Sequence, residues 1–394
     1  MAGSSRLDQY PSITGKLETS FAYFTIRNRL PYILHKIIEE NNYVGDERSG
    51  LEDLRNNILY GKVEFLPVNG AKIAKWEKWL RPFIGKTWYE LPFYFAEAYF
   101  YSMILDRINY FMDEIDPFLK TKRKDILDNS DQFSLILRNL RKYFQKEKDR
   151  SLRLNYLLHL CLWGNKSDLS QIELNRTESG NLQAGYTLID DAERICNVFS
   201  TKCERVDIIL DNSGIELFTD LVLANQLISL GFAKTVVLHA KQLPTFVSDA
   251  TIEDIRQLCD FLRNQHDHET QEFAVLIEDY LKSSRIIIKD HSFWNAPLHF
   301  YEMPLTLYLE LEKSDMIVFK GDANYRRIFG DKELPLSLKT EDLAHYLPTN
   351  SMTIRILKSE IITGLSTHEI SEVNHFEQDW LISGKYGLIQ LIKV

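Results

Sequence analysis

Residues 206–214 read Val206-Asp207-Ile208-Ile209-Leu210-Asp211-Asn212-Ser213-Gly214, and an apolar segment from Ile215 to about Leu230 follows them. This pattern predicts a buried strand, a polar turn and then a helix. In an open α/β sheet, ligands bind outside the carboxyl ends of the strands, so Asp211 and Asn212 are expected on the floor of a crevice. Both side chains offer oxygen ligands, which suit a hard divalent cation. We therefore interpret the chain as an enzyme built around a metal ion held at this turn.

Short β-branched runs that alternate with helical segments continue after residue 205, at Thr235–His239, Arg285–Ile288 and Met316–Phe319. Two further strand-like segments, Thr353–Leu357 and Gly387–Ile392, are expected at a sheet edge. Helices between such strands cover both faces of a parallel sheet. Residues 186–394 are therefore predicted to form an α/β domain, a doubly wound three-layer α/β/α unit with a mostly parallel sheet that carries the metal site and the catalytic residues.

The first 160 residues show helical spacing of their apolar side chains and predict an all-α unit. The expected helices cover Phe21–Glu40, Leu51–Leu59, Trp76–Phe83, Trp88–Phe111, Ile126–Tyr143 and Leu152–Leu162. Residues 171–188 are polar enough for a linker, and the helical N-terminal domain with its linker is placed at residues 1–185. A short helix is expected at Ile189–Phe199. Glu97 lies within an aromatic-rich run, either as one charged position on a partly exposed face or as a pocket carboxylate.

The composition narrows the class of protein. The chain has 394 residues with a net charge of −9, which argues against a general binder of nucleic acid or anionic membranes. The four cysteines show no CxxC pair and no zinc spacing, which favours reduced thiols in a cytosolic protein. The sequence contains neither an apolar signal core near its start nor a run of about 18 apolar residues. We expect a cytoplasmic protein, with a nuclear location also open.

Charged and polar side chains follow the strands at four places. They are Asp211-Asn212 with Glu216 one turn later, then Asp249, then Lys320-Gly321-Asp322-Ala323-Asn324, and finally Lys358. Taken singly, each is also an ordinary turn or helix cap. In a doubly wound topology all four converge on one crevice. Because carboxylates gathered in one place repel each other unless a cation or proton compensates them, the convergence favours a metal site.

The chemistry that these side chains suit is metal-assisted hydrolysis of a phosphoester. Asp211, Asn212 and Asp249 would hold one Mg²⁺- or Mn²⁺-type ion. Lys320 and Lys358 would neutralise phosphate charge, together with free amides at the start of a helix after Gly321. Asp322 would orient or deprotonate the attacking water, so that Asp211, Asp322 and Lys358 form the expected catalytic group. The sequence has no GxxxxGK[ST] motif, which argues against nucleoside triphosphate chemistry. The histidines show no ligand spacing.

Several motifs resemble the damage-control phosphatase family, also described as acidic-residue methyltransferases. They are Ser20-Phe21-Ala22-Tyr23, Arg29-Leu30-Pro31, Trp163-Gly164-Asn165-Lys166-Ser167-Asp168-Leu169-Ser170, Leu210-Asp211-Asn212-Ser213-Gly214, Phe246-Val247-Ser248-Asp249, Lys320-Gly321-Asp322-Ala323-Asn324-Tyr325-Arg326 and Gly384-Lys385-Tyr386-Gly387. The resemblance covers nearly the whole chain. It implies a helical N-terminal domain beside a three-layer α/β domain, which agrees with the pattern of the sequence.

The resemblance also implies an activity and a set of site residues. The activity is divalent-metal-dependent dephosphorylation of sugar phosphates such as fructose 1-phosphate and fructose 6-phosphate, with Mn²⁺ expected first and Co²⁺, Ni²⁺ or Mg²⁺ as alternatives. The implied metal ligands are Asp211, Asn212 and Asp249. The implied substrate contacts are Glu216, Lys358 and the loop Lys320, Gly321, Asp322, Ala323 and Asn324, to which we add Asn165 and Glu97.

Two departures from the family pattern concern substrate preference. The branch that this chain resembles carries Arg-Thr-x-Lys near the C-terminus, whereas this sequence reads Arg355-Ile356-Leu357-Lys358. An arginine pair that often follows Glu97 in the family is replaced by Ser102-Met103.

Two other functions stay open, which are S-adenosylmethionine-dependent methylation of protein glutamates and a non-catalytic scaffold that uses the aromatic helices. The expected partner is a small phosphorylated sugar, with no nucleic acid and no membrane.

Overall fold

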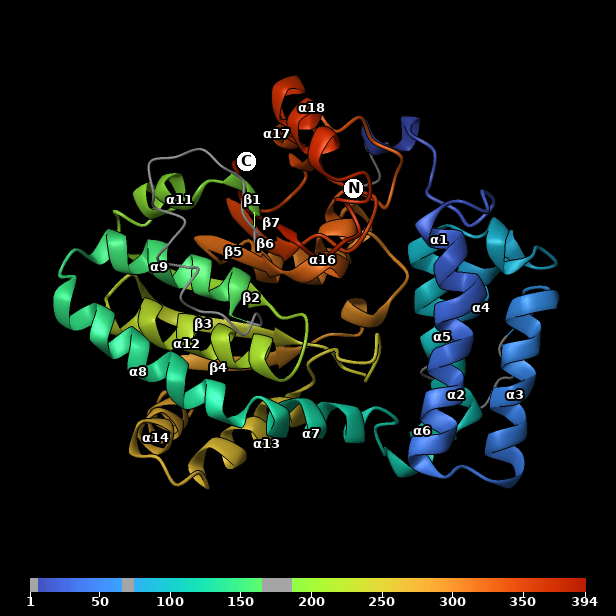
Figure 1. The fold of residues 1–394 in the computed structure, drawn as a ribbon, viewed down its shortest axis with the longest axis horizontal. Coiled ribbons are helices and arrows are strands. Elements are labelled where there is room, and N and C mark those ends of the chain that lie inside the picture. Colours follow the sequence, from blue (N-terminus) through green and yellow to red (C-terminus); the bar gives the residue numbers. More distant parts are fainter. Residues whose placement is uncertain (1–5, 66–73, 165–185) are drawn as a thin grey trace.

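The computed structural model describes residues 6–65, 74–164 and 186–394 (Figure 1). Within these residues a seven-stranded sheet runs in the order β1-β7-β6-β5-β2-β3-β4. The strands are β1 (Tyr186–Asp190), β2 (Cys203–Ile209), β3 (Ala233–Ala240), β4 (Ile286–Asp290), β5 (Met316–Lys320), β6 (Ser351–Ile356) and β7 (Tyr386–Ile392). β6 and β7 are antiparallel, and the other neighbouring strands are parallel. The predicted α/β fold with a mostly parallel sheet is therefore confirmed.

One side of the sheet differs from the sequence-based expectation. Thr353–Leu357 and Gly387–Ile392 correspond to β6 and β7, and both lie inside the sheet because β1 pairs with β7 as the edge strand. The expected helix at Ile189–Phe199 is in fact the end of β1 followed by α11 (Ala192–Val198). β1 is only five residues long and only partly buried, so it lacks the continuous apolar run by which the inner strands were recognised.

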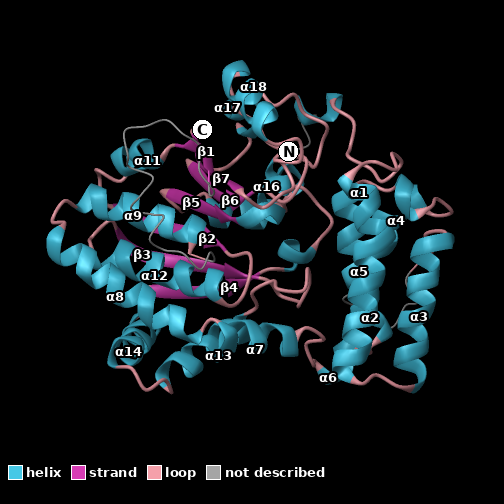
Figure 2. Ribbon diagram, in the orientation of Figure 1, coloured by secondary structure: helices cyan, strands magenta, loops and turns pink. Residues whose placement is uncertain are grey.

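Helices cover both faces of the sheet, which gives the three layers (Figure 2). Alternate strand residues point to opposite faces, so Ile208 and Ile209 enter different hydrophobic clusters. One cluster includes side chains from α7 (Leu119–Asp128), α8 (Ser130–Lys146), α9 (Arg150–Trp163), α11, α12 (Ile215–Ser229), α13 (Ile252–Arg263) and α14 (His268–Lys282). The other includes α15 (Leu305–Leu311), α16 (Gly321–Ile328), α17 (Thr340–Ala344) and α18 (Thr367–Phe376).

A separate group of helices, here called the helical unit, lies beside the carboxyl ends of the strands (Figure 1). Its core is rich in aromatic side chains from α5, including Phe95, Tyr99 and Phe100. Its helices are α1 (Phe21–Phe24), a π-helical turn (Thr25–Arg29), α2 (Leu30–Asn41), α3 (Gly45–Tyr60), α4 (Ala74–Leu80), α5 (Phe93–Arg107) and α6 (Tyr110–Asp113). Helices in the part of the chain that is described lack the length and apolar character that a membrane crossing requires.

The helical unit ends earlier than the predicted boundary at residue 185. Its core extends to Phe118, whereas side chains of α7, α8 and α9 pack in the same cluster as the sheet. Helical periodicity shows that a segment has an apolar face, but it does not show which core receives that face. Most of the expected linker lies outside the described residues, and the last part of it, from Tyr186, belongs to β1.

A buried ionic cluster joins the helical unit to the α/β unit. Arg326 of α16 pairs with Glu97 of α5 at 2.5 Å and with Asp331 at 2.8 Å. The second oxygen of Asp331 accepts a hydrogen bond from the backbone nitrogen of Tyr94 at 2.8 Å. All three ionic side chains are almost completely buried, so each depends on the others for charge compensation. The predicted pocket carboxylate Glu97 is therefore part of the contact between the two units.

Removal of one member of this cluster should destabilise the protein strongly. Asp331→Ala leaves Arg326 with one carboxylate and the Tyr94 amide without its acceptor, and we expect a loss of about 3–5 kcal/mol in unfolding free energy. Denaturant unfolding measures this loss. The matched control is Glu204→Ala, which removes a solvent-exposed ion pair with Lys234 and should leave the midpoint unchanged. Equal midpoints for both variants would contradict the assignment.

Candidate active site

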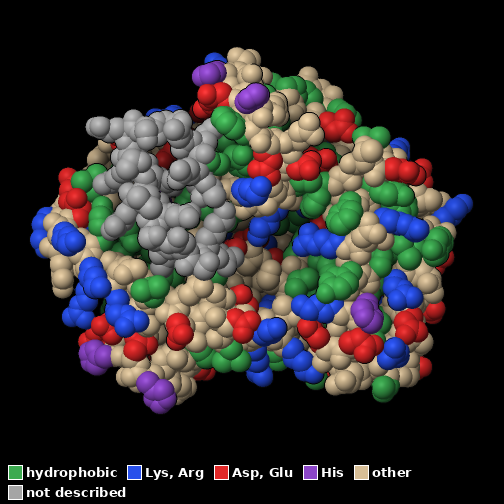
Figure 3. Space-filling model, in the orientation of Figure 1, with side chains coloured by type: hydrophobic (Ala, Val, Ile, Leu, Met, Phe, Trp, Pro, Cys, Tyr) green, Lys and Arg blue, Asp and Glu red, His purple; other side chains and the backbone are tan. Residues whose placement is uncertain are grey.

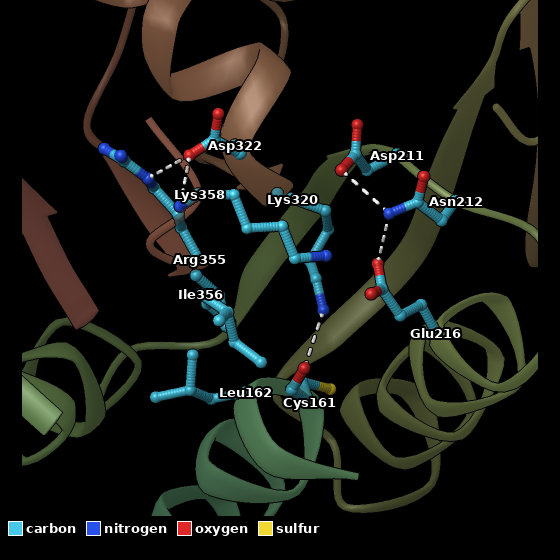
Figure 4. Close-up of a pocket in the computed structure, with 12 residues that line it drawn as sticks. Cys161, Leu162, Asp211, Asn212, Glu216, Lys320, Asp322, Arg355, Ile356 and Lys358 are labelled. Atoms are coloured by element: carbon cyan, nitrogen blue, oxygen red, sulfur yellow. Dashed lines mark hydrogen bonds and ion pairs between the residues drawn. The ribbon is translucent and has the colours of Figure 1, made fainter. Parts of the chain in front are cut away.

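A polar pocket lies at the carboxyl ends of three adjacent strands, β2, β5 and β6 (Figure 4). It is partly open to solvent. Its lining residues are Cys161, Leu162, Asp211, Asn212, Glu216, Lys320, Gly321, Asp322, Ile354, Arg355, Ile356 and Lys358. Most of the predicted site residues are thus brought together, as the strand-end argument requires. The space-filling view shows a recess near the middle of the molecule, with Lys, Arg, Asp and Glu side chains around it (Figure 3).

Asp211 is packed against the backbone of the next strand end. Gly321, directly after β5, has φ +79°, and a Cβ atom built at this position would overlap the Asp211 carboxylate. Residue 321 must therefore lack a side chain for two reasons, namely its left-handed backbone and the close approach of Asp211. The Asp211 side chain is 6% exposed. Burial raises its pKa to about 8, and the neighbouring Glu216 and Asp249 charges add to the rise, whereas Lys241 opposes it.

Asp249 reaches the same place through a loop that is bonded to the turn after β2. The backbone nitrogen of Ala250 donates to the Asp211 carbonyl at 2.8 Å, and that of Ser213 donates to the Ser248 carbonyl at 2.6 Å. An isolated β-bridge joins Asn212 to Asp249. Although Asp249 is not among the pocket-lining residues, its carboxylate acts on Asp211 electrostatically. The structure therefore places the predicted ligands Asp211, Asn212 and Asp249 in one cluster.

The loop before Asp249 has a strained backbone that the helical unit holds in place. Phe246 and Val247 have φ values of +49° and +69°, which are unusual for residues with side chains and especially for a β-branched one. The Phe246 ring packs on Tyr101 and Tyr94 of α5, with ring centroids 4.9 Å and 5.8 Å apart. Since Phe246 and Val247 also pack against the core of the helical unit, that unit supports the loop that carries Asp249.

Asn212 connects the acidic side chains. Its amide nitrogen donates to Asp211 at 3.1 Å and to Glu216 at 2.7 Å (Figure 4). Its amide oxygen accepts a hydrogen bond from the Ser248 hydroxyl at 2.7 Å. A half-turn of the amide would place the oxygen among the carboxylates, and the Ser248 hydroxyl could accept from the nitrogen instead. Asn212 can thus serve as a hydrogen-bond donor to the carboxylates or as an oxygen ligand beside them.

The cluster fits a divalent cation by its chemistry. Asp249 Oδ1 is buried and has no hydrogen-bond partner among the described residues, and Asp249 Oδ2 accepts from Thr245 at 2.5 Å. A buried carboxylate oxygen without a partner is unfavourable unless a cation faces it. The described residues contain no group of three His, Cys, Asp or Glu side chains placed to hold a metal. The oxygen donors beside the turn after β2 are the Asp211 and Asp249 carboxylates and the Asn212 amide, with Glu216 bonded to that amide.

The basic side chains of the pocket differ in how they are paired. Lys320 lies 2.7 Å from Asp220 and 3.2 Å from the Cys161 carbonyl, and Arg355 lies 2.9 Å from Asp322. Although burial opposes it, the Asp220 carboxylate raises the pKa of Lys320. Lys358 is exposed and forms no ion pair with any other described residue. Lys358 is therefore the lining cation that is available to an anionic ligand.

Asp322 fixes the position of the segment from Arg355 to Ser359, which lies beside it. Its Oδ1 atom accepts hydrogen bonds from Arg355, from the Lys358 backbone nitrogen and from the Ser359 hydroxyl. Burial works against ionisation, but the Arg355 guanidinium lowers the pKa of Asp322 below its usual value. A carboxylate with a low pKa and three donors is a poor proton acceptor. The geometry therefore favours a role for Asp322 in fixing the segment that carries Lys358, rather than the predicted role in deprotonating water.

Other predicted residues lie outside the pocket lining. Asn324 donates to the carbonyls of Ile209, Leu210 and Lys320, and so ties the start of α16 to the end of β2. Ala323 is on α16 but does not line the pocket, Glu97 is in the ionic cluster described above, and Asn165 lies outside the described residues. Of the two departures from the family pattern, Ile356 lines the pocket, whereas Met103 is buried in the core of the helical unit.

Several residues of the site were missed by reasoning from the sequence. Cys161 and Leu162 come from the end of α9, and Asp220 and Lys241 lie behind the pocket. Arg355 precedes the predicted Lys358 by three residues, but its pairing with Asp322 depends on the contact between β5 and β6. Of these residues, only Asp220 could have been found from the local sequence. It follows Glu216 by four residues and therefore lies on the same face of the predicted helix.

The fold and this pocket define an α/β protein that gathers carboxylates, an amide and basic side chains at a single crevice at the carboxyl ends of its strands. Residues 25–373 match the damage-control phosphatase ARMT1-like domain, and the chain belongs to that family. The resemblance inferred from the motifs is thereby confirmed.

Individual relatives agree with this assignment. The chain is 32% identical over 437 residues to the damage-control phosphatase ARMT1 of Xenopus tropicalis, covering 98% of this chain and 99% of that protein. It is 31% identical over 435 residues to the protein of the same name from Homo sapiens, covering 96% and 98%. Among solved structures, a DUF89 family protein from Pyrococcus horikoshii is similar with a TM-score of 0.46 and 13% identity, covering 90% of this chain and 93% of that one.

The contact between Asp211 and Gly321 can be tested with a matched pair of glycine variants. Gly85 has the same φ of +79°, and no atom lies within 4 Å of the place that a Cβ atom would take there. Both Gly85→Ala and Gly321→Ala should therefore lose about 1–2 kcal/mol from backbone strain. Gly321→Ala should lose about 1–3 kcal/mol more, because its methyl group displaces the Asp211 carboxylate. Denaturant unfolding measures the difference, and equal losses would show that Asp211 is not packed against residue 321.

Proposed function

We propose that this chain is a divalent-metal-dependent phosphatase that acts on small phosphorylated sugars. Its membership in the damage-control phosphatase family supports phosphoester hydrolysis in metabolite repair. The observation that carries the proposal is the meeting of Asp211, Asn212 and the adjoining Asp249 with an unpaired lysine of the pocket at the carboxyl ends of β2, β5 and β6. This combination offers a cation site next to a site for an anion.

The cation would be held by the carboxylates of Asp211 and Asp249 and by the amide oxygen of Asn212. All are hard oxygen donors, and for this set Mn²⁺ is the first candidate, with Mg²⁺, Co²⁺ and Ni²⁺ as alternatives. Such an ion polarises a phosphoryl oxygen and lowers the pKa of a bound water. The chain holds its ligands in advance, because Gly321 receives Asp211 and the loop before Asp249 is fixed on the helical unit.

The phosphoryl group would be bound on the opposite side of the pocket. Lys358 supplies a free positive charge, and Asp322 fixes the backbone of Lys358 through a hydrogen bond of 3.1 Å. The first backbone amides of α16, which begins at Gly321, add partial positive charge at the same wall. Lys320 can contribute a hydrogen bond, although Asp220 already balances its charge. These groups together recognise a dianion without a nucleotide-binding loop.

The lining of the pocket bears on the choice of substrate, because its polar and charged side chains suit a small anionic ligand. Fructose 1-phosphate and fructose 6-phosphate are the substrates that the family resemblance suggests. Ile356, which stands where the family branch has threonine, makes one wall of the pocket apolar and removes a hydroxyl donor, so the preference between these sugars rests partly on this residue.

The methyltransferase alternative receives less support from the same region. The turn after β2 contains Gly214, and a Cβ atom there would overlap the carboxylate of Asp125 from α7. That carboxylate also accepts a hydrogen bond from the Ile215 backbone nitrogen at the start of α12. The helix start that a nucleotide cofactor would use in a doubly wound fold is therefore filled by the chain itself.

The role of Asp211 can be tested with an isosteric substitution. Asp211→Asn keeps the contact with Gly321 but removes one negative charge from the cation site, so phosphate release from fructose 1-phosphate with Mn²⁺ should fall at least about 100-fold. A chelator should have the same effect on the wild-type protein. Asp315→Asn is the control, because Asp315 directly precedes β5 and so lies at the amino ends of the strands, away from the site at their carboxyl ends. Undiminished turnover by Asp211→Asn would remove the basis of the proposal.

Lys358 should act mainly on substrate binding. Lys358→Met keeps the length of the side chain and removes the charge, so KM for a sugar phosphate should rise about 10- to 100-fold. Steady-state kinetics with saturating metal measure this change. Lys393→Met is the control, since Lys393 is exposed beyond the end of β7, which runs antiparallel to β6. An unchanged KM for Lys358→Met would exclude this lysine from phosphate binding.

A further inference from the structure

Lys241 is a buried lysine that the mechanism above does not use. It follows β3 directly, and its side chain is only 2% exposed. Its Nζ atom lies 3.8 Å from Asp249 Oδ1, the oxygen that has no hydrogen-bond partner among the described residues. Its backbone nitrogen donates to the Ala250 carbonyl at 2.8 Å, and the nitrogen of Ala250 donates to Asp211. The lysine is therefore bonded into the same loop that joins the two carboxylates.

The charge of Lys241 acts on both carboxylates. It is the largest influence opposing the effect of burial on the pKa of Asp211, and the same holds for Asp249. Asp249 is the only described residue with which Lys241 forms an ion pair, and at 3.8 Å the two groups are not in hydrogen-bond contact. A hydrogen-bonded ion pair has a shorter distance between nitrogen and oxygen, such as the 2.7 Å between Lys320 and Asp220. Lys241 thus supplies positive charge without occupying a ligand position.

We propose that Lys241 is a built-in counter-ion that competes with the divalent cation for the carboxylates of Asp211 and Asp249. This inference rests on the metal site of the proposed function. When no divalent ion is bound and both carboxyl groups are ionised, the ammonium group offsets the repulsion between the two carboxylates and keeps the ligand set together. When an ion binds, the ammonium group repels it, so Lys241 weakens metal affinity and makes exchange of the ion easier. The lysine acts through the ligands and is a positioning residue.

The test compares Lys241→Met with Lys241→Arg by thermal unfolding at increasing Mn²⁺ concentration. Without metal, Lys241→Met should unfold at a lower temperature than wild type, because two buried carboxylates lose their counter-ion. With metal, its midpoint should rise more steeply, and its Kd for Mn²⁺ from calorimetry should fall about tenfold or more, which corresponds to the repulsion between the two cations at this range. Lys241→Arg keeps the charge and should follow wild type in both respects.

The possible outcomes separate this inference from the proposed function. If Mn²⁺ stabilises wild type and Lys241→Met with the same Kd, the counter-ion role is overturned and the metal site stands. If Mn²⁺ stabilises neither protein, the metal site and the counter-ion role both fail. If it stabilises only Lys241→Met, competition by the lysine is supported in its strongest form. Ile277→Ala is the destabilised control, since it opens a cavity in the core at α14, which carries no residue of the site, and it should leave the Kd for Mn²⁺ unchanged.

A double variant covers the case in which Lys241→Met does not fold without metal. In Lys241→Met/Asp249→Asn the lysine and one of the two carboxylates are both neutral, so the repulsion that destabilises the single variant is removed. Its metal-free midpoint should lie above that of Lys241→Met, and Mn²⁺ should no longer raise it. A double variant that is no more stable than Lys241→Met would show that Lys241 supports the fold by packing alone, and would overturn the inference.

Discussion

The architecture of the site depends on the burial of two like charges, Asp211 and Asp249, at the end of β2. Burial raises the pKa of both carboxyl groups, so the folded chain must compensate them. Neighbouring groups compensate these charges, because the Asn212 amide donates a hydrogen bond to Asp211 and the Lys241 ammonium group faces Asp249. Close packing accompanies it, since Asp211 occupies the space where a side chain at residue 321 would stand. In the proposed function, a divalent cation would complete a charge balance that the chain meets only in part by itself.

The helical unit and α7 hold these charges in position. The aromatic rings of α5 support Phe246 in its strained loop, and α7 reaches the same region with two charged side chains. Lys122 of α7 is buried and donates to the Asp249 carbonyl and to Asp254, each at 2.8 Å. Asp125 of α7 caps the start of α12, directly after the turn that carries Asp211. The helices that precede the sheet in the sequence therefore contribute to the site by fixing its loops, although few of their side chains line the pocket.

The sequence predicted what depends on local pattern and on the general geometry of parallel sheets. The inner strands, the helix after Gly214 and the meeting of Asp211, Lys320 and Lys358 all followed from apolar runs with polar residues at their ends. It did not predict what depends on contacts between distant segments. The short strand β1 was read as the end of a linker and the start of a helix. Helices α7 to α9 were grouped with the N-terminal helices, although their side chains pack in the same cluster as the sheet. Glu97 was expected near a substrate but pairs with Arg326. Lys241 and Arg355 gained a role only when the fold placed them beside Asp249 and Asp322.

The proposed function requires residues 211, 212 and 249 to share one cation. An anomalous-scattering map from crystals soaked in Mn²⁺ tests this requirement without reference to activity. We expect a single strong peak within bonding distance of the Asp211 and Asp249 carboxylates, with the Asn212 amide turned so that its oxygen faces the ion. A peak elsewhere in the molecule, or none at these side chains while Mn²⁺ still stimulates phosphate release, would contradict it.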